Sequence, residues 1–494
     1  MTLADERLRE LDNPSLTSEE RTLIRCRVAA DLTHAGQYEA AREALGELWP
    51  GVGERPDVKG LPPVVAAEVL LQCGALTGLL GHARNVSGAQ QRAQDLLSEA
   101  ARKFKSQGRH AKAAEAQCEL GACYWRLGAH DDARVMMCEA LKPLTDADVE
   151  LKAKIHIRRT LVEISENRYH EALAILKEAE AVFESASDAL KGRWHGQKAL
   201  VLRRLATAEG RGDYADRAVI EFTAAIYHYE RAKHERYCAR NLNNLAMLLY
   251  KLGRYGEAHE NLDRAQLIFT KLKDPGSLAQ VDDTRARALV AEKNYRDADR
   301  IIAGVIKTFE KGGESALLAD ALTVQGVVWA RLGAFDASVN VLRRALRVAQ
   351  DAGAPTSAGH AALTLIEEHG ATWRLPDAEL AKVYRQADGL LKGTQDAEDK
   401  ERLLAGARIV IKRLAGMQIH DKNFSLSGAV HELEATLIEQ ALEEVGGSVT
   451  KAARLLGLKY QTLIAKLKMK HKGLQDKRTP AEKRLKSIIK EPKE

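Results

Sequence analysis

The sequence predicts an all-α protein in which a long α-solenoid is followed by a small helix-turn-helix domain. A short phrase recurs at intervals near forty residues, aromatic residues make up only 5% of the chain, and two short helical segments joined at a glycine lie close to its end. With 494 residues the chain is too long for one ordinary hydrophobic core. These observations favour a repeat array with an added end domain.

The recurring phrase contains a turn residue, an aromatic residue two positions later and a small residue three positions after that. It is clearest in "GQYEAA", "NRYHEA", "GRYGEA", "KNYRDA" and "GAFDAS". The small residue falls at Ala41, Ala93, Ala133, Ala172, Ala218, Ala258, Ala298 and Ser338. Four of the seven steps between these positions are forty residues long and one is thirty-nine. Such a period predicts a solenoid of stacked units.

Each unit is predicted to be a helix, a turn and a second helix. In segment 239–269 the apolar residues follow helical spacing in two stripes separated by Gly253. The stripes are Leu242, Leu245, Ala246 and Leu249, then Ala258, Leu262 and Ala265. One such hairpin cannot bury both stripes, so stacking of neighbouring units is expected to supply the core.

This pattern resembles the tetratricopeptide repeat over residues 20 to 350, and on to about 392. Residues of the family's packing types stand at Gly326, Trp329, Leu342 and Ala345, and earlier at Gly121, Tyr124, Ala133 and Ala140. The period here exceeds the thirty-four residues usual in that family, so longer helices are expected.

The resemblance implies a concave groove, lined by the first helix of each unit, that holds a peptide or protein partner. By register, the groove residues are predicted to be Arg240, Asn243, Gln280, Asp283, Arg287, Asp320 and Thr323. The amide of Asn243 can both donate to and accept from a peptide backbone. The alternative for these positions is an ordinary hydrated surface.

Other features indicate a cytoplasmic protein that is not an enzyme. The N-terminus is charged and unlike a signal peptide, and the apolar stretch 62–81 is interrupted by Glu68 and Gln72, which favours a buried repeat helix over a membrane span. The six cysteines form no Cys-x-x-Cys pair and are expected to be buried, reduced thiols. Phosphate-binding loops, zinc-protease motifs and nucleophile elbows are absent, so no cofactor, metal or catalytic residue is predicted.

The end of the array is marked by a polar stretch, "GTQDAEDK" at 393–400, a helix at 401–416 and an irregular segment at 417–428. We therefore divide the chain into four parts. These are a repeat array (1–392), a linker with a connecting helix (393–428), a helix-turn-helix (429–474) and a basic tail (475–494).

The end domain is predicted to contain helices at 429–445, 449–456 and 459–470. Gly446 and Gly447 end the first helix, and Ser448 is a suitable N-cap for the second. The spacing of a helix-turn-helix is met by Ala453, Gly457, Leu458, Leu463 and Leu467. The small residue lets the two helices cross, the glycine permits the turn, and the leucines seat the last helix on the core.

This arrangement leaves one face of the last helix free to enter a DNA major groove. That face is predicted to carry Lys459, Tyr460, Gln461, Ile464, Ala465 and Lys468. Contacts to phosphates are predicted for Lys466, Lys468, Lys470, Lys472 and the lysines of the tail. Residues 448–494 hold fourteen Lys or Arg and four Asp or Glu, a net charge of +10, whereas the whole chain carries only +6. The alternative is a helical hairpin that only caps the solenoid.

Residues 429–474 resemble the Fis-type helix-turn-helix found at the C-terminus of bacterial NtrC-type regulators, and "GGSVTKAARLLGLKYQTLIAKLK" follows that pattern closely. The resemblance implies a homodimer, held by the helix at 429–445, that binds a palindromic site in double-stranded DNA. Lys459 stands where a Ser-like cap is common, and Tyr460 and Ala465 stand where Arg is frequent. The ATPase module of NtrC-type activators is absent.

These features together predict a DNA-binding transcriptional regulator whose repeat array binds a peptide or protein partner. The alternative is a scaffold or adaptor protein that uses its end domain for dimerisation or for loose binding to nucleic acid.

Overall fold

A computed structural model describes residues 8–34, 36–84, 86–372, 374–394, 396–420 and 426–477. All regular secondary structure within these residues is helical. The chain divides into two compact units. The first unit comprises Met1–Thr364 and Ala387–Leu403, and the second comprises Leu365–Gln386 and Leu404–Glu494.

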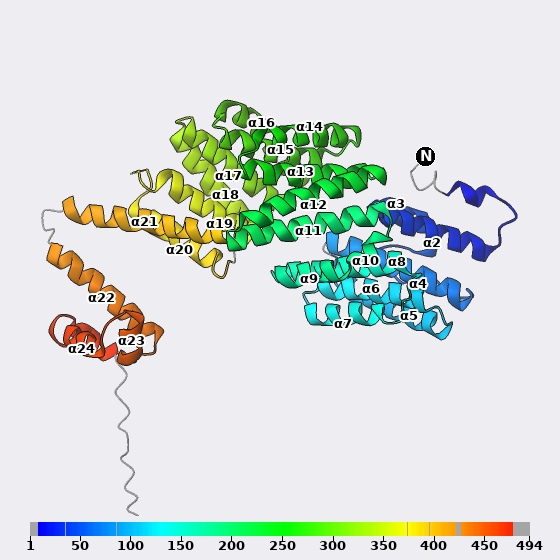
Figure 1. Cartoon of the computed structure of the whole chain (residues 1–494), viewed down its shortest axis with the longest axis horizontal. Helices are drawn as coiled ribbons and strands as arrows, with labels where there is room; N and C mark the ends of the chain where they lie inside the picture. Colours follow the sequence, from blue (N-terminus) through cyan, green and yellow to red (C-terminus); the bar gives the residue numbers. More distant parts are fainter. Residues whose placement is uncertain are drawn as a thin grey trace, which may run out of the picture. The chain divides into compact units, whose positions relative to one another are not determined.

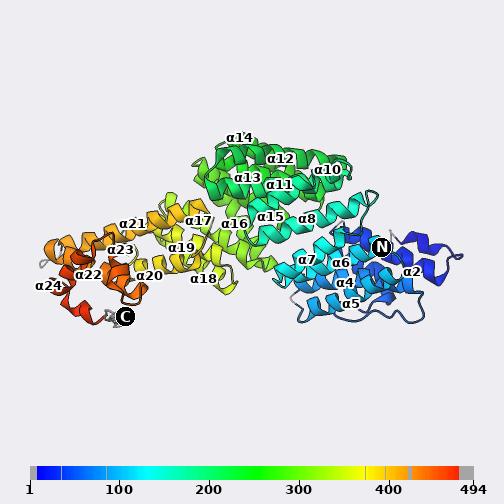
Figure 2. The same cartoon turned by 60° about the horizontal axis from the view of Figure 1, so that its bottom comes forward.

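The first unit is a row of helices that pack in successive pairs, as the all-α solenoid prediction requires (Figures 1 and 2). The early elements are η1 (Arg9–Asp12), α2 (Ser18–His34), α3 (Tyr38–Leu45), η2 (Gly46–Leu48), α4 (Pro63–Ala83), α5 (Ala89–Ser106), α6 (His110–Arg126), α7 (His130–Leu141), α8 (Val149–Ser165), α9 (Tyr169–Glu178) and α10 (Glu180–Glu184). The later elements are α11 (Asp188–Glu209), α12 (Gly212–Arg231), α13 (Glu235–Lys251), α14 (Tyr255–Lys271), α15 (Pro275–Ala291), α16 (Tyr295–Gly312), α17 (Ser315–Arg331), α18 (Phe335–Asp351) and α19 (Pro355–His369).

The small residue of the repeated phrase lies at the point where the two helices of a pair meet. All eight of these residues, from Ala41 to Ser338, have no exposed surface. Two paired helices also come close at Gly326, where an added Cβ would lie 2.4 Å from the side chain of Leu342. The forty-residue spacing of small residues in the sequence thus marks the helix contacts of the solenoid.

The turn between paired helices requires a left-handed backbone at the first residue of the phrase. Gly253 and Gly333 have φ angles of 75° and 82° there, values that glycine adopts at little cost. Asn167 and Lys293 occupy the same place with φ angles of 58° and 65°. The phrase therefore holds its conformation even where glycine is missing.

The apolar helix α4 belongs to the core of the first unit. It is the one helix in the described part of the chain that is long and apolar enough to cross a membrane, but 83% of its apolar window is buried against other helices. Five of the six cysteines are buried, as predicted. The prediction is wrong for Cys138, which is exposed because it lies on the outer side of α7.

The boundary between the two units falls within α19, α20 (Asp377–Leu390) and α21 (Ala397–His420). In the second unit, α21 is anchored by the buried Arg413, which forms an ion pair of 2.8 Å with Asp377 and donates to the backbone oxygen of Gly370 at 3.1 Å. A helix is therefore present at 401–416, as predicted, and it extends further at both ends. The four domain boundaries given above remain predictions.

The end of the second unit contains α22 (Leu426–Glu444), α23 (Val449–Leu455), α24 (Tyr460–Met469) and η3 (Lys472–Lys477). They share a small core made of Ile438, Ala441, Leu442, Ala452, Ala453, Leu463 and Leu467. Gly446 and Gly447 end α22 with φ angles of 62° and 83°, as their cap role requires.

Candidate nucleic-acid interface and repeat groove

The turn between α23 and α24 gives the end domain its helix-turn-helix geometry. Gly457 adopts a φ of 64°, and the backbone N–H of Leu458 donates to Ala453 at 2.8 Å. Ala453 is 1% exposed, and Leu463 and Leu467 have no exposed surface. Ser448 is the N-cap of α23, but its side chain makes no capping hydrogen bond. The small residue, the glycine and the leucines thus take the places that the spacing predicts.

The predicted DNA-reading residues lie at and after the start of α24. Most of them are exposed: Lys459, Tyr460, Gln461, Ala465 and Lys468. Ile464 is half-buried, because it lies nearer the leucines that seat the helix. Of the predicted phosphate contacts, Lys470 and Lys472 are exposed, and Lys466 is half-buried.

Lys466 is half-buried because it takes part in a network that ties α24 and η3 to α22. Its ammonium group forms an ion pair with Glu434, and Nε2 of the buried His471 lies 3.0 Å from the other oxygen of that carboxylate. The contact with Lys466, followed by that with His471, lowers the pKa of Glu434 to about 2. Lys477 of η3 forms further ion pairs with Glu439 and Glu443 of α22. No motif or spacing in the sequence predicts this network.

Helix α22 also presents apolar surface that the domain's core does not cover. Leu437 is 46% exposed, although its neighbour Ile438 is buried. The core of one copy of the domain therefore leaves this leucine of α22 uncovered.

The predicted groove residues of the array fall into two groups. Arg240 and Asn243 of α13 and Gln280 of α15 line one small cavity of about 80 Å³, together with Ser277. The side-chain oxygen of Asn243 is buried there and has no hydrogen-bond partner among the described residues. A buried, unpaired acceptor is costly unless a ligand or water satisfies it.

The other groove residues interact within the array. Arg287 donates to Asp283 at 2.7 Å, and Thr323 donates its hydroxyl to the backbone oxygen of Ala319 at 2.8 Å. Burial raises the pKa of Asp320. Of the predicted groove residues, only Arg240, Asn243 and Gln280 line the small cavity.

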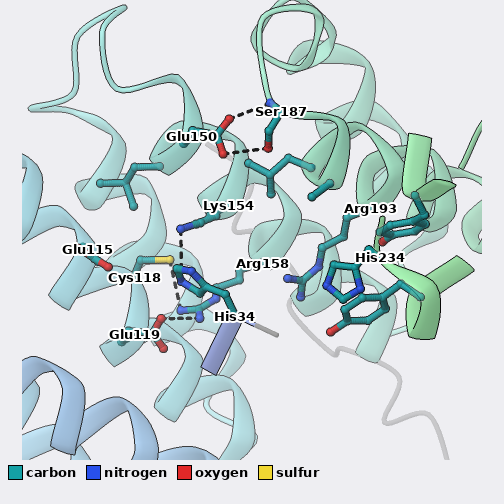
Figure 3. Close-up of a pocket in the computed structure, with 15 residues that line it drawn as sticks. His34, Glu115, Cys118, Glu119, Glu150, Lys154, Arg158, Ser187, Arg193 and His234 are labelled. Atoms are coloured by element: carbon teal, nitrogen blue, oxygen red, sulfur yellow. Dashed lines mark hydrogen bonds and ion pairs between the residues drawn. The ribbon is translucent and has the colours of Figure 1, made fainter. Parts of the chain in front are cut away.

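A larger cavity lies among the earlier repeats and was not predicted. It is lined by α6, α8, α11 and the start of α13, with His34 from the end of α2 (Figure 3). The register that places Arg240, Gln280 and Asp320 in the groove also passes through Glu115 and Lys154, which line this cavity. Continuing that register toward the N-terminus would have found it.

Comparison with known proteins supports both parts of the architecture. Residues 429–469 match the family model described as bacterial regulatory protein, Fis family. The chain matches no curated protein in sequence.

Among solved structures, the chain is similar to a signal transduction ATPase with a tetratricopeptide repeat sensor from Pyrococcus horikoshii. Sequence identity is 12%, the TM-score is 0.50, and the match covers 78% of this chain and 55% of that one. The apo quorum sensor NprR from B. thuringiensis matches with 15% identity, a TM-score of 0.49 and coverages of 70% and 92%. Aspartyl phosphate phosphatase F from Bacillus subtilis matches with 15% identity, a TM-score of 0.47 and coverages of 70% and 88%.

The buried small residues and the paired helices define the architecture of the array, and the packing of α24 on its core defines that of the end domain. The chain is a tetratricopeptide-like α-solenoid followed by a helix-turn-helix whose residues 429–469 are similar to the Fis family of bacterial regulatory proteins.

Proposed function

We propose that this protein is a cytoplasmic transcriptional regulator that binds a palindromic DNA site as a homodimer and responds to a peptide or protein held by its repeat array. The observation that carries the proposal is the placement of α24. Leu463 and Leu467 hold the helix on the domain's core, while Lys459, Gln461 and Lys468 face solvent. A helix supported in this way can reach base edges with its polar side chains.

Two copies are needed to read a palindrome, and α22 offers the surface to join them. Leu437 exposes 46% of its surface, whereas Ile438, Ala441 and Leu442 of the same helix are buried. Pairing two copies through this helix would cover the leucine and place two α24 helices on one duplex.

The array's part in the proposal is supported by the small cavity on α13 and α15. The unpaired oxygen of Asn243 is an acceptor for a backbone N–H, and Gln280 and Arg240 stand beside it. An extended peptide presents such donors at regular intervals.

Selection from a pool of random DNA duplexes tests this function. We expect the full-length protein, at moderate salt, to enrich a palindromic sequence. A Gln461→Ala variant should enrich a shorter or more degenerate one, whereas Lys307→Ala, an exposed change on α16, should behave as the wild type. Enrichment of no sequence would reject the regulator and leave the scaffold as the better explanation.

A further inference from the structure

The cavity beside Arg158 lies between the first helices of successive pairs, and its volume is about 230 Å³. An adjoining cavity of about 260 Å³ shares Glu119, Arg158 and Arg193 with it. Figure 3 shows Lys154, Arg158 and Arg193 extending into this space from α8 and α11. The residues that line the two spaces include seven charged groups: Glu115, Arg126, Glu119, Glu150, Lys154, Arg158 and Arg193.

Every acidic group in this set already has a partner. Glu115 pairs with Lys112 at 3.0 Å. Glu119 pairs with Arg158 at 2.5 Å. Glu150 accepts hydrogen bonds from the backbone N–H and the hydroxyl of Ser187, at 2.7 and 3.1 Å. These carboxylates are therefore occupied in holding the array together.

Three of the basic groups have no such partner. Within the described residues, Arg126, Lys154 and Arg193 form no ion pair with a carboxylate. The closest polar neighbour of Lys154 is the ring of His34, with 3.3 Å between Nζ and Nε2. Burial lowers the pKa of Arg126, and the nearby Lys154 adds to burial in lowering the pKa of His34. The four basic and three acidic groups carry a net charge of +1, and the excess lies with basic groups that have no carboxylate at ion-pair distance.

An uncompensated, partly buried charge is costly, and surface arginines normally avoid such places. The cost is offset where an anion binds. Arginine is suited to this role because its fork of donors matches the geometry of carboxylate and phosphate oxygens. The walls add aromatic surface from Tyr38, Trp125 and Tyr237, and the ring of Tyr229 is stacked on that of Tyr237 at 5.5 Å.

We propose that this cavity binds an anionic group, a carboxylate or a phosphate, of the peptide or protein to which the array responds, and that Arg126, Lys154 and Arg193 hold it. The inference rests on the proposed function, since it assigns a position and a charge to the array's ligand. Tyr237 lies on α13 three residues before Arg240, so the cavity and the groove at Asn243 belong to the same helix. One ligand can therefore reach both, with its charged end among the earlier repeats.

Thermal unfolding of the full-length protein in citrate, inorganic phosphate or chloride, at equal ionic strength, tests this proposal. We expect citrate, phosphate or both to raise the melting temperature of the wild type by a few degrees over chloride. An Arg126→Gln, Arg193→Gln double variant should lose most of that shift. The double variant Arg296→Gln, Arg347→Gln makes the same charge change at exposed positions outside the cavity and should keep it.

Each probe identifies one source of the charge. A response to citrate alone assigns the cavity to a carboxylate, and a response to phosphate alone assigns it to a phosphate group. The proposal is overturned if the wild type responds to neither anion, or if the cavity variant and the surface variant respond equally.

A second measurement needs no ligand. In chloride, the Arg126→Gln, Arg193→Gln variant should melt at or above the wild-type temperature, because it removes uncompensated charge. Arg158→Gln should melt lower, because it leaves Glu119 without its partner. Equal losses in the two variants would mean that Arg126 and Arg193 are structural. If the anion response fails while a DNA palindrome is still enriched, only the cavity assignment is rejected and the regulator stands.

Discussion

The ammonium group of Lys466 in α24 is paired with the carboxylate of Glu434 in α22, and His471 contacts the same carboxylate from the segment after α24. A lysine that the sequence analysis assigned to DNA phosphates is thus engaged inside the domain. In this position it fixes the angle between α24, which is proposed to face DNA, and α22, which is proposed to join two copies.

Replacing Glu434 with Gln should weaken the packing of α24 against α22. The variant loses the charge opposite Lys466, and we expect a loss of about 1 kcal/mol in the free energy of unfolding of a fragment spanning residues 426–494, measured with urea. Glu444→Gln, an exposed change on the same helix, is the control and should have little effect. An unchanged stability in Glu434→Gln would mean that the network does not support α24.

The same pair predicts how stability depends on pH. The pKa of Glu434 is about 2 in the folded protein, against about 4.3 in an unfolded chain. A carboxyl group with a lowered folded pKa contributes its full stability above the unfolded value and loses it as the pH falls toward the folded value. The stability difference between the wild-type fragment and Glu434→Gln should therefore shrink between about pH 4.3 and pH 2. A difference that grows over that range would contradict the lowered pKa.

The close approach at Gly326 predicts opposite effects for two glycine substitutions. A methyl group at Gly326 would press on Leu342, which is fully buried and cannot move aside. We expect Gly326→Ala to destabilise the array by about 1–3 kcal/mol. Gly304→Ala in α16 meets no atom within 4 Å and should stabilise it by about 0.5–1 kcal/mol, the gain in helix propensity. Thermal unfolding of the two variants should show shifts of opposite sign.

Lys293 adopts an unfavourable backbone conformation at a turn where most repeats have glycine. Its φ of 65° lies in the left-handed region, which disfavours a residue with a Cβ by about 1 kcal/mol. We expect Lys293→Gly to raise the melting temperature of the array. Lys307→Gly, in the middle of α16, removes the same side chain from a regular helix and should lower it. A fall in both variants would show that the Lys293 side chain stabilises the turn.

Local spacing predicted the parts of this fold that depend on neighbouring residues. The eight small residues lie where paired helices approach, and Gly457 lies where the chain turns. Each of these requirements selects a small residue or a glycine, which can be recognised in the sequence. The second end-domain helix, predicted at 449–456, spans Val449–Leu455. Spacing could not show the left-handed backbone of Lys293, because the phrase defines a turn without defining its hand.

Contacts between segments far apart in the sequence could not be predicted from local spacing. Glu434 meets Lys466 and His471 only after the chain has folded back through two turns, and no periodicity links them. Arg193 reaches the cavity from the repeat that contains the longer step between Ala172 and Ala218, where the forty-residue register fails. Its position could be found only once α11 was placed in space.

The exposed Leu437 predicts how the protein assembles. If α22 joins two copies, Leu437→Glu places a charge in the contact and should yield a monomer in light scattering after size-exclusion chromatography. Leu267→Glu is the matched control, because Leu267 is 74% exposed on α14 of the array and the same change there should leave the assembly intact. A dimer that survives Leu437→Glu would exclude this face of α22 as the interface.

Substitutions on the exposed face of α24 are expected to weaken DNA binding in two different ways, one that depends on the DNA sequence and one that does not. Gln461 lies at the start of the helix, where a side-chain amide can pair with one base, so Gln461→Ala should relax preference at one position and cost about 1–3 kcal/mol on the selected palindrome. Lys468 faces solvent near the end of the helix, and Lys468→Ala should weaken binding to every duplex alike and lower the salt dependence by about one phosphate contact. Affinities measured on the palindrome and on single-base variants, at two or more salt concentrations, separate these effects. Identical losses for both variants on every duplex would mean that α24 contacts only the DNA backbone, because a base contact must distinguish one sequence from another.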